Sequence, residues 1–288
     1  MTRRIALPVI AALVLTVACS SGGGGNAASS NPSEPTSGGA SSSSTTTTAP
    51  VTEGKVPILV TNDDGVHAPG IDRLVESLRA IPDVSVTVVA PAENQSGSGD
   101  RTSPGTVAAH RAKTASGRRA WAVVGTPADS VNWAFGNLHT LPQLVVSGVN
   151  QGQNLGPIAE VSGTVGAART AARHGVDALA VSQGLGSPPD YALGARYARR
   201  WVIGHLAVIR DRRARRARLL MKIDVPTCPT RSVRGLVAVP LAKSMDNRGA
   251  VATPNCASRV QNPKDDIEAF NNGFAAESSF DADLTALH

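Results

Sequence analysis

From residue 55 onward, short runs of aliphatic residues alternate with segments whose apolar residues recur every three or four positions. Short aliphatic runs that stop at turn-forming residues are typical of buried strands, whereas the longer spacing is typical of a helix packed on a core. The runs predict strands at residues 56–61, 84–90, 121–124, 144–147, 178–182 and 219–225. The helical spacing predicts helices at residues 71–80, 128–135, 163–174 and 191–209.

This alternation of strands and helices indicates the fold class. Short buried strands separated by helices favour an α/β fold in which a doubly wound, mostly parallel sheet lies between two helix layers, a Rossmann-like three-layer arrangement. Such sheets bind ligands beyond the carboxyl ends of their strands. After about residue 227 the periodicity fades, so we expect a small irregular C-terminal extension of short strands, loops and one small helix.

The front of the chain has the order of an export signal. Residues 1–19 begin with Arg3 and Arg4, continue through an apolar stretch and end at Cys19. A cysteine at this boundary resembles a lipoprotein signal, although Thr16 stands where that motif usually has an aliphatic residue. An ordinary secretory signal and an uncleaved anchor are the alternatives. We expect an exported protein, held at the cell membrane only by an N-terminal lipid, or secreted if Cys19 is not lipidated.

Residues 20–54 separate this signal from the rest of the chain. They consist mainly of short runs of Gly, Ser and Thr, with almost nothing to bury, which predicts a disordered linker. The expected organisation is therefore a signal at 1–19, a linker at 20–54 and one folded domain at 55–288.

Composition excludes several classes of protein. With 41% hydrophobic and 17% charged residues, the chain is neither fully disordered nor a polytopic membrane protein. The net charge of +6 includes six arginines between Arg210 and Arg218, but no aromatic residues are interleaved with them. We therefore expect no nucleic-acid binding. The run is either a solvated helix end or loop, or a surface that attracts phosphate-bearing ligands or anionic lipid.

Two of the three cysteines lie within the predicted domain, at Cys228 and Cys256. An even pair in an exported protein indicates a disulfide. In the chain-entropy model, closing a loop of about 30 residues stabilises the fold by about 3 kcal/mol. Two free thiols too far apart to meet are the alternative.

Polar side chains gather where three predicted strands end. They are Asn62, Asp63 and Asp64 after the first strand, Asn94 and Ser96 after the second, and Asn150 and Asn154 after the fourth. Carboxylate, amide and hydroxyl oxygens are ligands for Mg²⁺, Mn²⁺ or Ca²⁺ rather than zinc or copper. His67, three residues past Asp64, either donates a proton to a leaving group or caps its loop.

Four motifs in order make this pattern more specific. They are V-T-N-D-D-G-V-H-A-P-G-I at 60–71, A-P-A-E-N-Q-S-G-S-G at 90–99, V-S-G-V-N-Q-G-Q-N-L-G at 146–156 and V-S-G-T-V-G-A-A at 161–168. The series closely resembles the SurE (survival protein E) family of divalent-metal-dependent phosphatases acting on nucleoside monophosphates. The resemblance is strongest over residues 55–185, and weaker at 223–226 and 266–274.

The resemblance implies one divalent metal ion, Mg²⁺, Mn²⁺ or Ca²⁺, held by Asp63, Asp64, Ser96 and Asn150. It also implies that Ser162, Gly163 and Thr164 lie beside the substrate phosphate, where a helix begins and its N–H groups favour an anion. Asn94 and Asn154 either orient the phosphate or fix their loops. We expect Asp63 and Asp64 to be the catalytic pair, with Asp63 orienting a water that attacks phosphorus; a covalent role for either carboxylate stays open.

Several residues depart from the family pattern. Val161 stands where an aromatic residue is often seen, Arg169 and Thr170 replace an acidic residue and a glycine, and Asp224 stands where Asn is common. The region 227–265 is short and basic beside the family's substrate-covering hairpin and swapped arm. Substrate choice and oligomer geometry are open for this reason, although a homodimer or tetramer is expected.

These features predict an exported phosphomonoesterase of the 5′-nucleotidase type, which hydrolyses nucleoside monophosphates to nucleoside and phosphate. A lipoprotein that binds nucleotide or phosphate without hydrolysing it is one alternative. A phosphatase acting on another phosphoester such as polyphosphate is the other.

Overall fold

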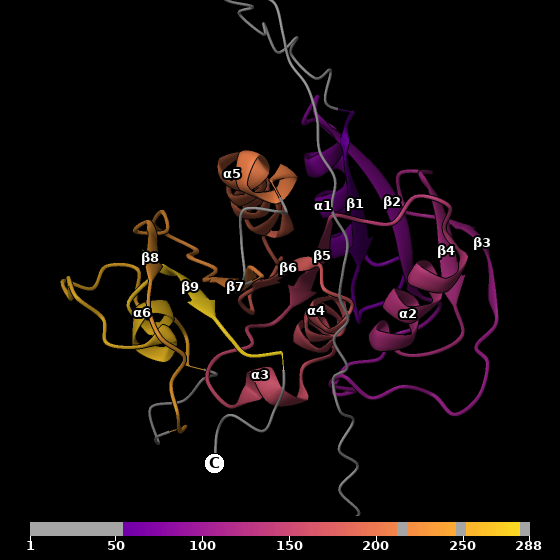
Figure 1. Cartoon of the computed structure of the whole chain (residues 1–288). Coiled ribbons are helices and arrows are strands. Elements are labelled where there is room, and N and C mark those ends of the chain that lie inside the picture. The colour runs from indigo at the N-terminus through magenta and orange to yellow at the C-terminus, as the bar shows by residue number, and fades with distance from the viewer. Residues whose placement is uncertain (1–53, 212–217, 246–251, 283–288) are drawn as a thin grey trace, which may run out of the picture. The chain divides into compact units, whose positions relative to one another are not determined.

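A nine-stranded sheet forms the centre of the fold, in the order β3-β4-β2-β1-β5-β6-β7-β9-β8 (Figure 1). The computed structural model describes residues 54–211, 218–245 and 252–282. The strands are β1 (Val56–Thr61), β2 (Val84–Pro91), β3 (Ala109–Lys113), β4 (Arg119–Val123), β5 (Leu144–Gln151), β6 (Asp177–Gln183), β7 (Leu220–Val225), β8 (Leu236–Ala238) and β9 (Ala275–Ser279). The helices are α1 (Pro69–Arg79), α2 (Pro127–Asn137), α3 (Ile158–Val161), α4 (Gly163–Arg173), α5 (Tyr191–Arg210) and α6 (Asp266–Asn271).

The expected signal with Cys19, and the expected linker up to residue 53, lie outside the described residues, as does most of the arginine run. Residues Thr52–His288 make up one unit of the chain. Within the described ranges, no helix combines the length and apolar character needed to cross a membrane.

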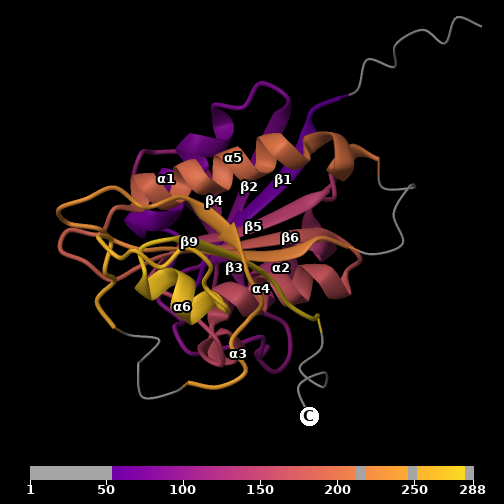
Figure 2. The same ribbon diagram turned by 90° about the vertical axis from the view of Figure 1, so that its left-hand side faces the viewer.

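Alternating side chains of the central strands build two separate cores. Along β1, Ile58 and Val60 pack with α1 and α5, whereas Leu59 between them packs with α2 and α4 on the other face. Figure 2 shows the two helix layers above and below the sheet. Because β1 is covered on both faces, it reads as a continuous aliphatic run. The predicted three-layer α/β fold is confirmed.

The six central strands of the sheet, from β4 to β7 in the sheet order, run parallel, whereas β3 and β9 on either side of them run antiparallel. β4-β2-β1-β5-β6-β7 pair in parallel, so their carboxyl ends meet at one edge of the sheet. β3 pairs antiparallel with β4, and neither its position nor that of α3 was predicted. The sequence of β3, A-H-R-A-K, is mostly exposed and carries no aliphatic run to reveal it.

The region after residue 227 is less irregular than its sequence indicates. β9 joins the main sheet antiparallel to β7, and β8 pairs in parallel with β9. The small predicted helix is present as α6. A disulfide joins Cys228 to Cys256, with their Cα atoms 5.9 Å apart. The extension therefore completes the sheet at the edge formed by β7.

Candidate active site

Asp63 and Asp64 lie directly after β1, at the edge where the parallel strands end. Asp63 is buried, with 3% of its surface exposed, and Asp64 is partly exposed. The backbone carbonyl of Asp63 accepts a 2.7 Å hydrogen bond from the N–H of Gln95 in the loop after β2. The first two predicted loops therefore lie side by side, as a shared carboxyl edge requires.

The Asp63 carboxylate faces the beginning of α4. Its Oδ1 accepts a 2.5 Å hydrogen bond from Thr164 Oγ1. Burial raises the pKa of Asp63, while the Thr164 hydroxyl and the backbone N–H groups of Thr164 and Gly163 act in the opposite direction. The N-terminal end of α4, expected to face a substrate phosphate, thus already faces a protein carboxylate. The two sites predicted separately form one site.

Asp64 is held less tightly. Its Oδ2 accepts a hydrogen bond of 3.2 Å from the N–H of Gln151 at the end of β5. Burial, with the neighbouring charge of Asp63, raises the pKa of Asp64 to about 7. Neither carboxylate is ion-paired with a Lys, Arg or His in the part of the chain that the structure describes. Two adjacent carboxylates without a countercharge favour a bound cation.

Gly163 permits the close approach of α4 to Asp63. A Cβ atom at this position would lie 2.8 Å from Asp63 Cβ and 2.7 Å from Ser98 Oγ. The preceding residue, Ser162, caps the helix by accepting a hydrogen bond of 3.2 Å from the N–H of Val165. A glycine after the cap is therefore required by packing, which the S-G-T motif alone does not show.

The polar side chains in the loop after β2 differ in their exposure and in their hydrogen bonds. Asn94 and Ser96 are exposed, and Asn94 Oδ1 accepts a 2.9 Å hydrogen bond from the N–H of Ser96. Ser98, which was not predicted as a site residue, is buried beside Gly163, and its hydroxyl has no hydrogen-bond partner in the described chain. Ser96 keeps an exposed hydroxyl free to reach a ligand, whereas the Asn94 carbonyl is engaged in its own loop.

Asn150 reaches the site through an irregularity in β5. The register with β6 shifts between Ser147 and Asn150, and Gly148 within it has φ of 136°, a conformation that favours glycine. Asn150 is buried, and its amide nitrogen donates a 2.6 Å hydrogen bond to the carbonyl of Gly152. With the amide nitrogen engaged, the side-chain oxygen is the group left to contact a ligand.

The residues present fit a divalent metal. The hard oxygen donors here are the Asn150 amide oxygen, the Ser96 hydroxyl and two carboxylates that have no ion-pair partner among the described residues. Among the described residues, no cluster of three or more His, Cys, Asp or Glu side chains could hold a metal. A cation here would therefore rely on amide, hydroxyl and water oxygens beside the carboxylate pair, as the four predicted ligands imply.

Comparison with known proteins identifies the family. The model of the family "Survival protein SurE" matches residues 58–248. The chain is 40% identical over 203 residues to 5′-nucleotidase SurE of Geobacter metallireducens, covering 68% of this chain and 74% of that protein. It is 34% identical to 5′-nucleotidase SurE of Erythrobacter litoralis, covering 79% of this chain and 94% of the relative. The chain belongs to the SurE family.

A solved SurE structure has the same fold. The crystal structure of the SurE protein from Aquifex aeolicus matches with a TM-score of 0.63 and 25% identity, over 80% of this chain and 95% of that one. The resemblance expected from the motifs is therefore confirmed. The roles of individual residues remain predictions, and the geometry above supports them to different degrees.

Asn154 belongs to a buried polar network with Ser182 and Asp224. Its backbone N–H donates a 2.6 Å hydrogen bond to Asp224 Oδ1, and its side-chain amide donates one of 2.9 Å to Ser182 Oγ. These contacts favour the alternative in which Asn154 fixes its loop. Asp224, a departure from the family pattern, thus has a definite partner in the loop that follows β5.

Lys222 completes this network and was not singled out from the sequence. Its fully buried ammonium donates hydrogen bonds of 2.5 Å to Asp224 and 2.9 Å to Asp266. Burial opposes the charge, but the two carboxylates outweigh it and raise the pKa of Lys222. Asp266 in turn accepts N–H groups from Gly156 and Ala242. The sequence could have indicated this network through the lysine within the aliphatic run 219–225, because lysine is rarely buried unless its charge is paired.

The remaining residues singled out from the sequence make no hydrogen bond or ion pair with the carboxylates in the described chain. Val161 is exposed. Arg169 is buried and donates hydrogen bonds to the carbonyls of Ala159 and Asp281, so it ties α4 to the chain after β9. His67 lies in the turn before α1 with an exposed side chain.

Proposed function

We propose that this SurE protein is a divalent-metal-dependent phosphomonoesterase that hydrolyses nucleoside monophosphates to nucleoside and phosphate. A nucleotidase or phosphatase activity is supported by the curated relatives, which are named 5′-nucleotidases. The metal dependence rests on one observation in this chain. Among the described residues, neither Asp63 nor Asp64 has a cationic side-chain partner, and the Asp63 carboxylate meets the first turn of α4.

The proposed metal would be held by Asp63, Asp64, Ser96 and Asn150. When bound, it would offset the negative charge of the phosphate oxygens and favour attack by water. Asp63 orients that water and accepts its proton, and Thr164 keeps the carboxylate in place through Oδ1. The positive end of the α4 dipole stabilises the negative charge that gathers beside Asp63. The leaving alkoxide takes a proton from solvent or from His67.

The test is phosphate release by the full chain from a panel of nucleoside monophosphates. Each assay is run with EDTA alone and after addition of Mg²⁺, Mn²⁺ or Ca²⁺. The proposal expects EDTA to abolish release and at least one of the metals to restore it. Hydrolysis that continues in EDTA would remove the metal dependence and keep the phosphatase activity. A folded protein that retains nucleotides without releasing phosphate would favour the binding-only alternative.

The proposed location follows from the N-terminal sequence. We infer that Cys19 is lipidated after export and that the linker lets the domain stand away from the membrane. In cells that make the protein, C19A should move it from the membrane fraction to the soluble exported fraction, whereas S20A should not. Mass measurement of the mature N-terminus checks the modification itself. An unmodified Cys19 would contradict the inference.

A further inference from the structure

A cavity of about 970 Å³ lies at the carboxyl ends of β6 and β7. Its walls come from the loop after β6, the first two turns of α5 and the loop after β7, with Thr253 from the segment that follows. This volume is in the range of sites that bind small organic molecules. The family motifs and the carboxylate pair do not account for it.

Two chains of contacts relate this cavity to the site of the carboxylates. Gln151 donates its N–H to Asp64, and the next residue, Gly152, lies against the side chain of Leu185, which lines the cavity. On the other side, the ring of Tyr191 and the carbonyl of Val149, the residue before Asn150, both lie against Gly70. Asp190, the residue before Tyr191, also lines the cavity. A substrate whose phosphate lies at Asp64 can therefore extend into it.

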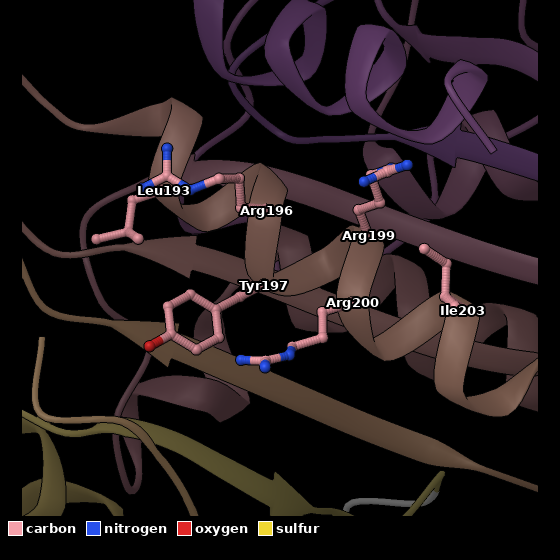
Figure 3. Close-up of a pocket in the computed structure, with 6 residues that line it drawn as sticks. All are labelled: Leu193, Arg196, Tyr197, Arg199, Arg200 and Ile203. Carbon is pink, nitrogen blue, oxygen red and sulfur yellow. The ribbon is translucent and has the colours of Figure 1, made fainter.

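The lining suits a flat group with a polar edge. Tyr197 is half-buried and supplies an aromatic face, and Leu193 and Val233 add apolar surface. Hydroxyl groups and two guanidinium groups surround them, with Arg231 on the wall opposite α5. Figure 3 shows the ring of Tyr197 projecting from α5 beside the side chain of Arg200, in an adjoining hollow of about 470 Å³. Aromatic rings stack with nucleobases of any sequence, and arginine adds polar and cation–π contacts.

The disulfide holds one wall of the cavity. Cys228 lines it, and its bond to Cys256 joins the loop after β7 to the segment that carries Thr253. That loop also bonds to the end of β6, since Gln183 donates a 3.0 Å hydrogen bond to Thr227 Oγ1. The wall is therefore cross-linked on both sides. Because the loop is already held in place, a ligand loses less free energy in ordering it.

We propose that this cavity binds the base and ribose of the nucleoside monophosphate, with the Tyr197 ring as the stacking surface and the disulfide-linked loop as the opposite wall. This assignment rests on the proposed function. It adds where the base and ribose of the substrate bind, which the proposed function did not specify. Specificity between nucleotides would then be decided at β6 and β7, away from the carboxylates that act on the phosphate.

The test compares Y197L with Y197F in the full chain, using the nucleotide that the wild type hydrolyses fastest. Inhibition constants are also measured for the corresponding free nucleoside and for inorganic phosphate. Loss of one stacking contact should raise KM and the nucleoside inhibition constant about ten-fold in Y197L. The kcat and the phosphate inhibition constant should stay within about two-fold of wild type. Y197F keeps the ring and should therefore raise both constants much less than Y197L.

A lower kcat in Y197L with an unchanged nucleoside inhibition constant would overturn the assignment. So would a free nucleoside that does not compete with substrate in the wild type. If the wild type is inert on every nucleotide, the proposed function fails and this assignment falls with it. Should Y197L not fold, R231Q replaces it, because Arg231 is exposed on the opposite wall and its loss should raise the same two constants.

The disulfide provides an independent arm of the test. The double variant C228S/C256S should raise KM and the nucleoside inhibition constant in the same direction, with inorganic phosphate unaffected. A mild reductant should reproduce this change in the wild type and have no further effect on the double variant. A nucleoside inhibition constant that is unchanged without the disulfide would remove the loop after β7 from the binding site.

Discussion

Thr164 Oγ1 donates a 2.5 Å hydrogen bond to Asp63 Oδ1, joining the first turn of α4 to the end of β1 across 101 residues of sequence. The bond is buried, so it fixes the orientation of the carboxylate rather than exchanging with water. One oxygen of Asp63 is thereby committed to the protein. The other lies toward Gly163, where the helix dipole favours negative charge.

Removing either carboxylate should abolish phosphate release while the fold persists. We expect D63N and D64N to lower kcat by about 10²–10⁴-fold, because each loses a group that orients the attacking water or the cation. D83N is the matched control, since Asp83 is an exposed carboxylate before β2. Phosphate release and circular dichroism check the prediction. Full activity in both site variants would exclude this pair from the chemistry.

A methyl group at Gly163 should displace the catalytic carboxylate. The added Cβ would lie 2.8 Å from Asp63 Cβ and 2.7 Å from Ser98 Oγ, so the Asp63 side chain or the start of α4 must shift. Overpacking of this kind costs about 1–3 kcal/mol in the free energy of unfolding, and kcat should fall as Asp63 moves. G204A is the control, because nothing lies within 4 Å of a Cβ on Gly204 in the exposed face of α5. An active G163A with unchanged unfolding would show that the close approach is not needed.

Lys222 should be the most sensitive member of its buried network. K222M leaves Asp224 and Asp266 as two buried carboxylates without a cation, and such a loss costs about 3–5 kcal/mol. D224N should cost less, because the ammonium keeps Asp266 and the network then carries no net charge. Urea unfolding of the two single variants and of K222M/D224N measures the coupling. Additive effects would mean that the residues do not act as a unit.

The acidity of Asp64 predicts how metal binding and stability depend on pH. Its pKa is raised from 3.8 to about 7, so in this interval the metal-free folded protein keeps a proton that the unfolded chain has released. The free energy of unfolding of the EDTA-treated protein should therefore fall as pH rises between these values. D64N should flatten that dependence, which thermal unfolding at several pH values will measure.

Metal affinity should show the opposite dependence on pH. A cation must displace the proton from Asp64, so affinity should weaken by up to about ten-fold per pH unit below the pKa of about 7. Titration calorimetry with Mg²⁺ or Mn²⁺, one unit below and one unit above this value, tests the prediction in buffers of different ionisation heat. Binding that is independent of pH and releases no proton would place the cation away from Asp64.

The sequence pattern predicted some elements of this fold and missed others. The aliphatic runs predicted β1, β2, β4 and β5 to β7, because side chains that pack against the helix layers are mostly apolar. The same reasoning missed β3, whose exposed side chains carry no periodic signal. It also did not show that β9 pairs with β7, because pairing depends on neighbours that are distant in sequence.

The candidate site, too, was predicted only in part from the sequence. The sequence by itself determined that Asp63 and Asp64 follow a buried strand and that a small-residue helix begins at Gly163, since burial and helix starts leave local patterns. Only the tertiary structure decided that Thr164 holds Asp63, that Lys222 is paired with Asp266, and that a cavity lies at the carboxyl ends of β6 and β7. These contacts join segments about 40–100 residues apart, and local periodicity carries no information about which distant side chain will meet another.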